Sequence, residues 1–183
     1  MPFLSLLSAN ADTTAALDDI RRQLSMRWTG PIDVALTFFS PHHLREADRI
    51  AREMAVLEPR AHLGCPGEAV IANDREIEKG PALCLWVGRW AQPIQVTPFQ
   101  LAIEQTSEGY SLLGWPDELG DAAPAQALVL AVADPFSFPV DDFLGQINDE
   151  QPGLRVLGGM ASGAREPGVH RSEERRVGKE CRL

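Results

Sequence analysis

The sequence predicts an α/β fold: a mixed, largely parallel sheet with covering helices and an antiparallel hairpin in the middle. The segments 34–39 and 127–133 are continuous apolar runs of strand length, and such strands are buried on both faces of a sheet. Each run is followed by a proline-bearing loop, a segment with helical spacing and a second short strand. The chain therefore builds the same strand–helix–strand unit twice.

The first elements are a strand and a helix. Residues 1–8 carry an apolar patch that is too short for a signal sequence, and we expect a strand there. Asp12 is a suitable N-cap, and Leu17 and Ile20 follow on one face of a helix that ends before Pro31.

The first strand–helix–strand unit begins with the run at 34–39. Ser40 as N-cap and Pro41 at the first helical position predict the start of a second helix, and Pro59 ends it. The residues 69–71 are apolar and predict the next strand.

The middle of the chain has a different character. The runs 82–90 and 94–103 are strand-like, and residues 91–93 between them predict a hairpin. Pro98 restricts the second run to a sheet edge or a bulge. Residues 105–126 are rich in turn formers and predict a surface loop.

The second unit begins with the run at 127–133. A helix follows with Phe143 and Ile147 on its inner face, and the pair at 152–153, Pro-Gly, ends it. The residues 154–157 predict a strand that leads into a glycine-rich turn.

The last residues resemble translated adapter DNA. Arg171 to Arg182 read RSEERRVGKECR, which matches the in-frame translation of a common short-read sequencing adapter. We therefore expect residues 1–170 to form one domain and residues 171–183 to be an artefactual tail that packs against nothing. On this interpretation the natural protein was truncated near His170, and the fold is incomplete at the C-terminus. The alternative is a native basic tail.

Charge and cysteine content narrow the class of protein. Without residues 171–183, the 17 basic and 26 acidic residues become 12 and 23, so the net charge moves from −9 to −11. Such an acidic balance argues against nucleic acid and against anionic membrane surfaces as partners. No apolar run reaches membrane-spanning length. Cys65 and Cys84 alone make no disulfide framework, and we expect a cytoplasmic protein.

Ligands of open α/β sheets bind beyond the carboxyl ends of the strands, and four segments fall there. Glycines allow close approach of the backbone, and helix N-termini after Ser40 and near Pro139 would offer N–H groups to an anion such as a carboxylate. The alternative is that these segments are ordinary turns. The candidate ligand-binding residues are Ser40, His42, Gly64, Cys65, Gly67, Glu68, Asp134, Ser137, Gly158, Gly159 and Ser162.

Several side chains allow two interpretations. Cys65 could be a nucleophile with His62 as its base, or a small structural residue. Asp134 could orient a ligand amine or cap its own turn. Glu68 precedes an apolar triplet that would draw it toward the interior, where a carboxylate needs a partner.

Metal, nucleotide and esterase signatures are missing from the sequence. His42 and His43 open a helix, and we expect them to face solvent rather than hold zinc. The glycines at 158–163 do not follow the G-x-G-x-x-G pattern, and there is neither a Walker A run nor a G-x-S-x-G elbow. We therefore expect no metal and no cofactor.

Seven segments follow one another in an order more specific than any single motif. They are FFSPHH at 38–43, LGCPGEAVIA at 63–72, REIEKGPALCLW at 75–86, TPFQL at 97–101, GWPDEL at 114–119, ADPFSFP at 133–139 and GLRVLGGMASG at 153–163. Together they resemble the N-terminal part of a FIST-domain protein over nearly all of residues 1–165. One departure is clear: the family pattern G-C-S-G-E-G has a serine and a glycine where this chain has Pro66 and Ala69, and proline removes an N–H from the turn.

The resemblance implies a sensory or signal-transduction domain that binds a small polar metabolite such as an amino acid, and a second, C-terminal FIST segment that normally follows. It implies no catalytic activity. Two alternatives from other classes remain open: a hydrolase or transferase that uses Cys65, and a protein-interaction scaffold without a small ligand.

Overall fold

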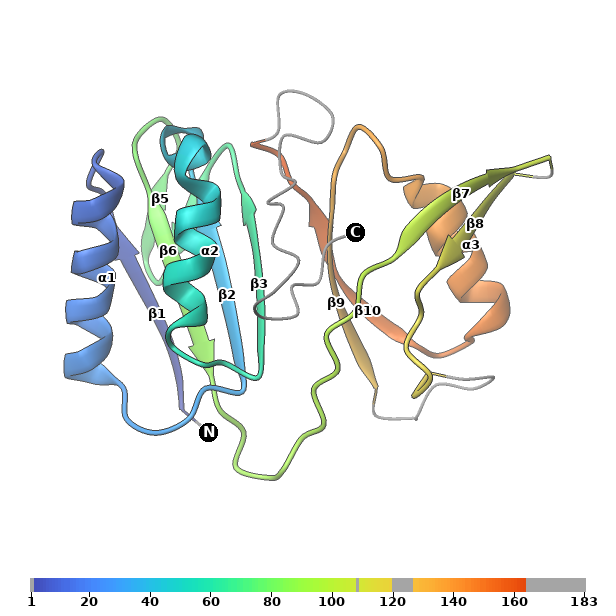
Figure 1. Cartoon of the computed structure of the whole chain (residues 1–183), viewed down its shortest axis with the longest axis horizontal. Helices are drawn as coiled ribbons and strands as arrows, with labels where there is room; N and C mark the ends of the chain where they lie inside the picture. Colours follow the sequence, from blue (N-terminus) through green and yellow to red (C-terminus); the bar gives the residue numbers. More distant parts are fainter. Residues whose placement is uncertain (1, 108, 120–126, 164–183) are drawn as a thin grey trace.

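The computed structural model describes residues 2–107, 109–119 and 127–163, which form two lobes joined by an extended segment (Figure 1). The first lobe comprises residues 2–90 and the second lobe residues 91–163. The elements of the first lobe are β1 (Phe3–Ser8), α1 (Thr13–Arg27), β2 (Val34–Phe39), the 3-10 helix η1 (Pro41–Glu46), α2 (Ala47–Ala55), β3 (Ala61–Pro66), β4 (Val70–Ala72), β5 (Arg75–Ile77) and β6 (Leu83–Gly88).

The first lobe is built on a four-stranded sheet in the order β1-β6-β2-β3. β2 and β3 are parallel, whereas β6 runs antiparallel to both β1 and β2. The predicted strand–helix–strand unit is therefore present as β2-α2-β3. Its second strand is residues 61–66, however, not residues 69–71, which form β4 and pair with β5.

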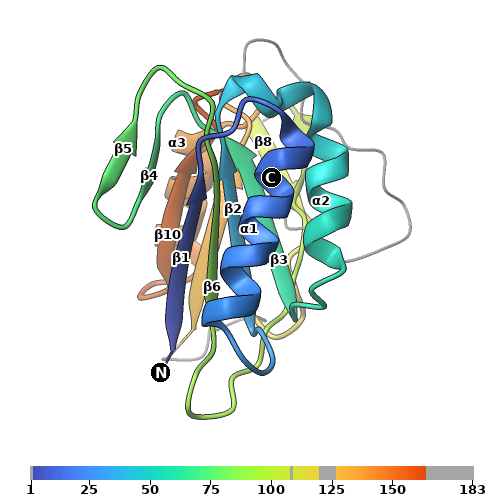
Figure 2. The same cartoon turned by 90° about the vertical axis from the view of Figure 1, so that its left-hand side faces the viewer.

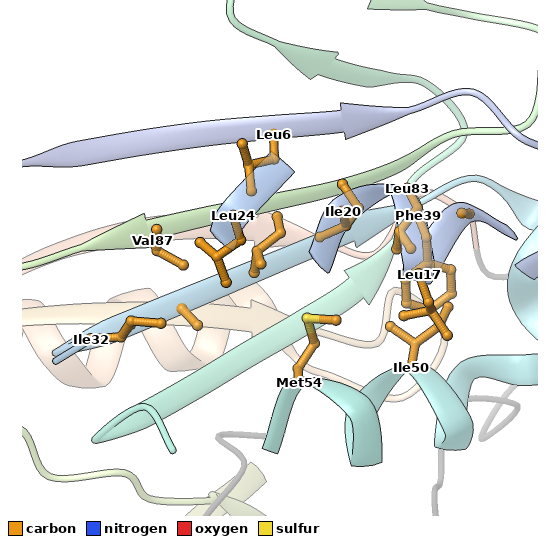
Figure 3. Packing of buried hydrophobic residues seen from close by; sticks show 13 residues of the cluster. Leu6, Leu17, Ile20, Leu24, Ile32, Phe39, Ile50, Met54, Leu83 and Val87 are labelled. Carbon is orange, nitrogen blue, oxygen red and sulfur yellow. The ribbon is translucent and has the colours of Figure 1, made fainter. Parts of the chain in front are cut away.

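α1 and α2 lie on one face of this sheet (Figure 2). Asp12 caps α1 as predicted, because its Oδ1 accepts a hydrogen bond of 2.9 Å from Ala15 N. Side chains from both helices meet the strands in one continuous cluster, in which Ile50 and Met54 of α2 lie beside the α1 and strand side chains (Figure 3). The β4–β5 hairpin packs on a second cluster of the first lobe, which includes Cys84.

The described residues of the second lobe form two separate pairs of strands and one helix. Its elements are β7 (Ala102–Thr106), β8 (Gly109–Leu113), β9 (Leu128–Ala133), α3 (Val140–Glu150) and β10 (Arg155–Met160). β7 and β8 form an antiparallel hairpin, and β9 and β10 are parallel. Phe143 and Ile147 of α3 are buried against residues of both pairs, as their spacing predicts.

Two predictions about the sheets are wrong. The sheets are not largely parallel, since four of the six strand pairings among the described residues are antiparallel. The residues 82–90 also form no hairpin with 94–103, because β6 lies between β1 and β2, and residues 94–101 form no strand. Apolar periodicity predicts that a strand exists but not which strand pairs with it, and Pro98 lacks the N–H that a ladder needs.

Two further strands differ from the sequence-based prediction in their position or length. β8 lies inside the predicted loop at 105–126, and β10 extends through Gly158 and Gly159 to Met160 instead of turning at 157. Among the described residues, no helix combines the length and apolar character needed to span a bilayer. The expected artefactual tail, residues 171–183, lies outside the described part of the chain.

Candidate functional site

The carboxyl ends of four parallel-paired strands, β2, β3, β9 and β10, lie at the upper edge of the molecule in Figure 1. Backbone hydrogen bonds join these ends, and one of them crosses between the two lobes. Gly67 N donates to Phe39 O at 2.9 Å, which joins the end of β3 to the end of β2. Gly163 N donates to Pro66 O at 3.2 Å and joins the segment after β10 to β3. We call this region the strand-end junction.

Two further contacts complete the junction. Ala161 N donates to Ala133 O at 2.8 Å, so the end of β9 joins the same series. Glu68 N donates to the Oγ of Ser162 at 3.1 Å. The two glycine-containing segments, which are about ninety residues apart in sequence, are therefore in direct contact, as the equivalence of the two strand–helix–strand units predicts.

Gly163 is a tightly packed point of the junction. A Cβ at this position would lie 2.9 Å from Pro66 Cβ and 3.0 Å from Gly67 N. Backbone atoms on the opposite side cannot move aside as a flexible side chain can, so only glycine fits without a shift of one lobe. Pro66 contributes through its carbonyl oxygen, which its ring leaves available.

Ser40 connects strands inside the first lobe. Its side chain is only 1% exposed, and its Oγ accepts a hydrogen bond of 2.9 Å from Ala82 N. The Nδ1 of exposed His42 lies 3.2 Å from the same Oγ. The Ser40 hydroxyl thus holds the end of β2 to the segment that precedes β6, close beside the junction.

His43 does not face solvent, contrary to the sequence-based prediction. It is fully buried, and its Nδ1 lies 2.9 Å from Thr13 Oγ1, whereas its Nε2 has no hydrogen-bond partner within the described residues. Burial, together with neighbouring His42, lowers the pKa of His43, and the Asn10 carbonyl and Asp12 oppose this shift. A pair of adjacent histidines in a 3-10 turn cannot both reach water, because α1 covers one side.

Asp134 caps its own turn. Its Oδ1 accepts from Phe136 N at 3.0 Å, and its Oδ2 accepts from the Ser137 hydroxyl at 3.0 Å. These contacts support the interpretation of Asp134 as a cap of its own turn rather than as a group that orients a ligand amine. α3 follows with Asp141 and Asp142 in its first turn, and these carboxylates oppose the anion binding that this helix N-terminus was expected to offer.

Cys65 and His62 do not form a nucleophile–base pair. They are three residues apart in β3, so their side chains point to opposite faces of the sheet. In the register with β2, His62 lies opposite Ala35 and Cys65 opposite Phe38, and these two partners belong to different core clusters.

Burial also favours the neutral form of both groups. It raises the pKa of the Cys65 thiol to about 11 and lowers the pKa of His62 to about 4. The Nε2 of His62 lies 2.8 Å from Thr37 Oγ1, which gives the imidazole a structural partner on β2. A protonated thiol is a poor nucleophile at neutral pH.

The other predicted residues divide between the junction and the strands. Glu68 is exposed rather than drawn inward, because burial resumes only at Val70. Gly64 lies within β3, and Gly158 and Gly159 lie within β10, all on exposed stretches of backbone. The described residues contain no group of three potential metal ligands.

The fold and the junction define an α/β domain that presents loops from two lobes at the carboxyl ends of its parallel strands. The chain belongs to the FIST family: the model of the FIST N domain matches residues 33–176. This is a family of sensory domains of signal transduction.

Mycobacterial proteins are among the relatives. An uncharacterized protein of Mycobacterium bovis is 32% identical over 127 residues, which cover 69% of this chain and 31% of the relative. An uncharacterized protein of Mycobacterium tuberculosis is 31% identical over 136 residues, covering 74% of this chain and 34% of the relative. The chain thus spans about a third of the length of the curated relatives that it matches.

Proposed function

We propose that the strand-end junction binds a small polar metabolite that carries an amino group, such as an amino acid, and that the domain reports its presence within a cytoplasmic signalling protein. The observation that carries this proposal is the contact of Glu68 N with Ser162 Oγ, because it brings an exposed part of each lobe to one place. A ligand seated there would touch both lobes. Binding would therefore affect how firmly the lobes are joined.

The charges at the junction favour an amino group on the ligand. Glu68 is an exposed carboxylate, and Asp134 and the first turn of α3 add further negative charge at the neighbouring strand end. The residues 63–68, 133–138 and 158–163, which form the edge, contain no lysine or arginine. An ammonium group is thus attracted, and hydroxyl and main-chain groups beside the glycines suit the rest of a small polar molecule.

A thermal-shift screen with free amino acids tests the proposal. A ligand that binds only the folded state, present at a hundredfold its Kd, stabilises by about 2.7 kcal/mol and raises the Tm. We expect at least one amino acid to do so, and we expect Glu68→Gln and Ser162→Ala to reduce the shift. Glu76→Gln changes an exposed carboxylate of β5 and is the control.

Other outcomes select the other classes of function. If no amino acid shifts the Tm, the interaction scaffold is the better interpretation. If Cys65 is alkylated faster than a model thiol at neutral pH, its environment differs from the buried one described above, and the enzyme returns as a candidate.

A further inference from the structure

A cavity of about 260 Å³ lies in the second lobe, between the C-terminal half of α3 and the turn that follows β8. Its apolar walls are Trp115, Pro116, Leu119 and Ile147. Leu119 N donates to Pro116 O at 3.0 Å, so this turn is closed by its own backbone. An apolar cavity of about 150 Å³ holds benzene, so this cavity is large enough for a molecule with one small ring.

The walls of the cavity are held in place by aromatic packing. Trp115 stacks on Phe143 with ring centroids 6.0 Å apart and packs on Phe99 at 5.7 Å. Ile147 and Leu119 are both nearly buried in core clusters of the second lobe. A wall that is ordered before binding loses little conformational freedom when a ligand enters.

The polar part of the lining carries negative charge only. Asp117 and Glu150 are its charged residues, and both are exposed at the rim. Gln146 Nε2 donates to the Glu150 carboxylate at 3.0 and 3.1 Å, which orients that group one helical turn away. The residues that line this cavity include no basic side chain.

The surroundings strengthen the negative potential. Residues 91–163 contain ten acidic side chains and one basic side chain, Arg155, a formal charge of −9. The last turn of α3 has no basic residue but contains Asp149 and Glu150. A helix C-terminus already bears partial negative charge, so these carboxylates lie where a cation is favourable and an acid is not.

We propose that this cavity binds a small organic cation, an ammonium or guanidinium group on a compact apolar body. The apolar body contacts Trp115, Pro116 and Ile147, and the cationic group lies at the rim beside Asp117 and Glu150. The inference is independent of the proposed function of the strand-end junction. α3 begins near that junction and rises about 1.5 Å per residue, so Glu150 lies about 15 Å along the helix from Val140.

Three probe molecules of similar shape distinguish the contribution of charge to binding from that of apolar contact. Benzylammonium carries the cation, benzyl alcohol is its neutral counterpart, and benzoate is the anion. We expect calorimetry on the full chain to detect benzylammonium binding and no binding of the other two. The affinity for benzylammonium falls as salt is raised from 0.02 to 0.5 M, because exposed charges are screened.

Two substitutions that remove a carboxylate charge but keep the side-chain size test whether benzylammonium binds at the rim of this cavity. Glu150→Gln and Asp117→Asn each weaken benzylammonium binding about twofold to fivefold, the range of an exposed ion pair, and the double variant about tenfold. Glu104→Gln removes an exposed charge of β7 that does not line the cavity, and it leaves the affinity within twofold of the parent.

The proposal is overturned by any of three results: no binding of benzylammonium, equal binding of benzyl alcohol, or the same affinity in the double variant as in the parent. Loss of benzylammonium binding in Ser162→Ala would place the probe at the strand-end junction and would also overturn it. Failure of amino acids to bind the junction leaves these results unaffected, so the two proposals are tested separately.

Discussion

The two lobes differ in how they are stabilised. The first lobe packs α1 and α2 on a four-stranded sheet, and thirteen buried residues form its main cluster. Among its described residues, the second lobe divides the buried apolar side chains between clusters of six and three, and neither of its strand pairs has a third strand. The lobe with the larger sheet thus has one large core, whereas the other depends more on its aromatic contacts and on the junction.

The lobes also differ in charge. Residues 1–90 contain twelve acidic and ten basic side chains, a formal charge of −2, whereas residues 91–163 carry −9. Opposite charges offset one another in the first lobe, while like charges repel in the second. We therefore expect the stability of the second lobe to depend more strongly on ionic strength than that of the first lobe.

The largest effect is expected in the core of the first lobe. Leu85 is 0% exposed in β6, between β1 and β2, and Leu85→Ala should destabilise the protein by about 2–5 kcal/mol. Chemical denaturation measures this change, with Leu157→Ala on the exposed face of β10 as the control. If the second lobe keeps its own unfolding transition in Leu85→Ala, the lobes fold independently.

The second prediction uses His62, the partly buried histidine of β3. Burial lowers the pKa of His62 from 6.5 to about 4, so between these values the folded state binds fewer protons than the unfolded state. The resulting stability is complete above pH 6.5 and is lost as the pH falls toward 4, by about 3 kcal/mol. Denaturation at several pH values should show this slope.

Two variants check the origin of that slope. His62→Gln should reduce the pH dependence in this window while keeping a polar partner for Thr37, and the slope that remains is assigned to buried His43, whose pKa is also lowered. His42→Gln, at an exposed position of the same lobe, should retain it. A slope of equal size in His62→Gln would assign the acid sensitivity to other groups.

The third prediction concerns the link between the lobes. Gly163→Ala places a methyl group within about 3 Å of Pro66 and Gly67, and we expect a loss of about 1–3 kcal/mol. Gly159→Ala is the matched control, because a Cβ there meets nothing within 4 Å. Two separated unfolding transitions in Gly163→Ala would show that the junction couples the lobes; equal Tm values for both variants would show that it does not.

The smallest effect tests the charge of the second lobe. Asp149→Lys introduces a basic residue into the last turn of α3 and should stabilise by about 0.3–1 kcal/mol at low salt. Asp141→Lys makes the same change in the first turn, where an acid is favourable, and should destabilise. If both variants are stabilised equally, the gain in stability comes from the change in net charge and not from the helix dipole.

The sequence predicted the elements whose signals are local. The cap at Asp12, the buried strand at 34–39 and the inner face of α3 each depend on residues within one or two turns of the chain, and each is present. β3 was missed because His62, Gly64 and Pro66 have low strand propensity, and its formation depends on pairing with β2.

The contact between the two glycine-containing segments was predicted from the sequence, whereas the burial of the residues around it was not. The repeated strand–helix–strand unit is visible in the sequence, and each glycine-containing segment follows a strand of one unit. The contact between the segments of Glu68 and Ser162 could therefore be anticipated. The burial of His43 could not, because it requires the turn before α1 to cover η1. The cavity beside Trp115 gave no sequence signal, since its walls come from a turn and a helix about thirty residues apart.

The strand-end junction has a consequence for how freely its sequence can vary. Most of its hydrogen bonds run between main-chain groups, from Gly67 to Phe39 and from Ala161 to Ala133. Main-chain groups are the same for every residue except proline, so exchanges of side chain at these carbonyl positions leave the bonds intact. The side chains exposed at this edge can thus vary while the main-chain frame beneath stays constant, except at Gly67 and Gly163, where an added Cβ would meet atoms within 3 Å.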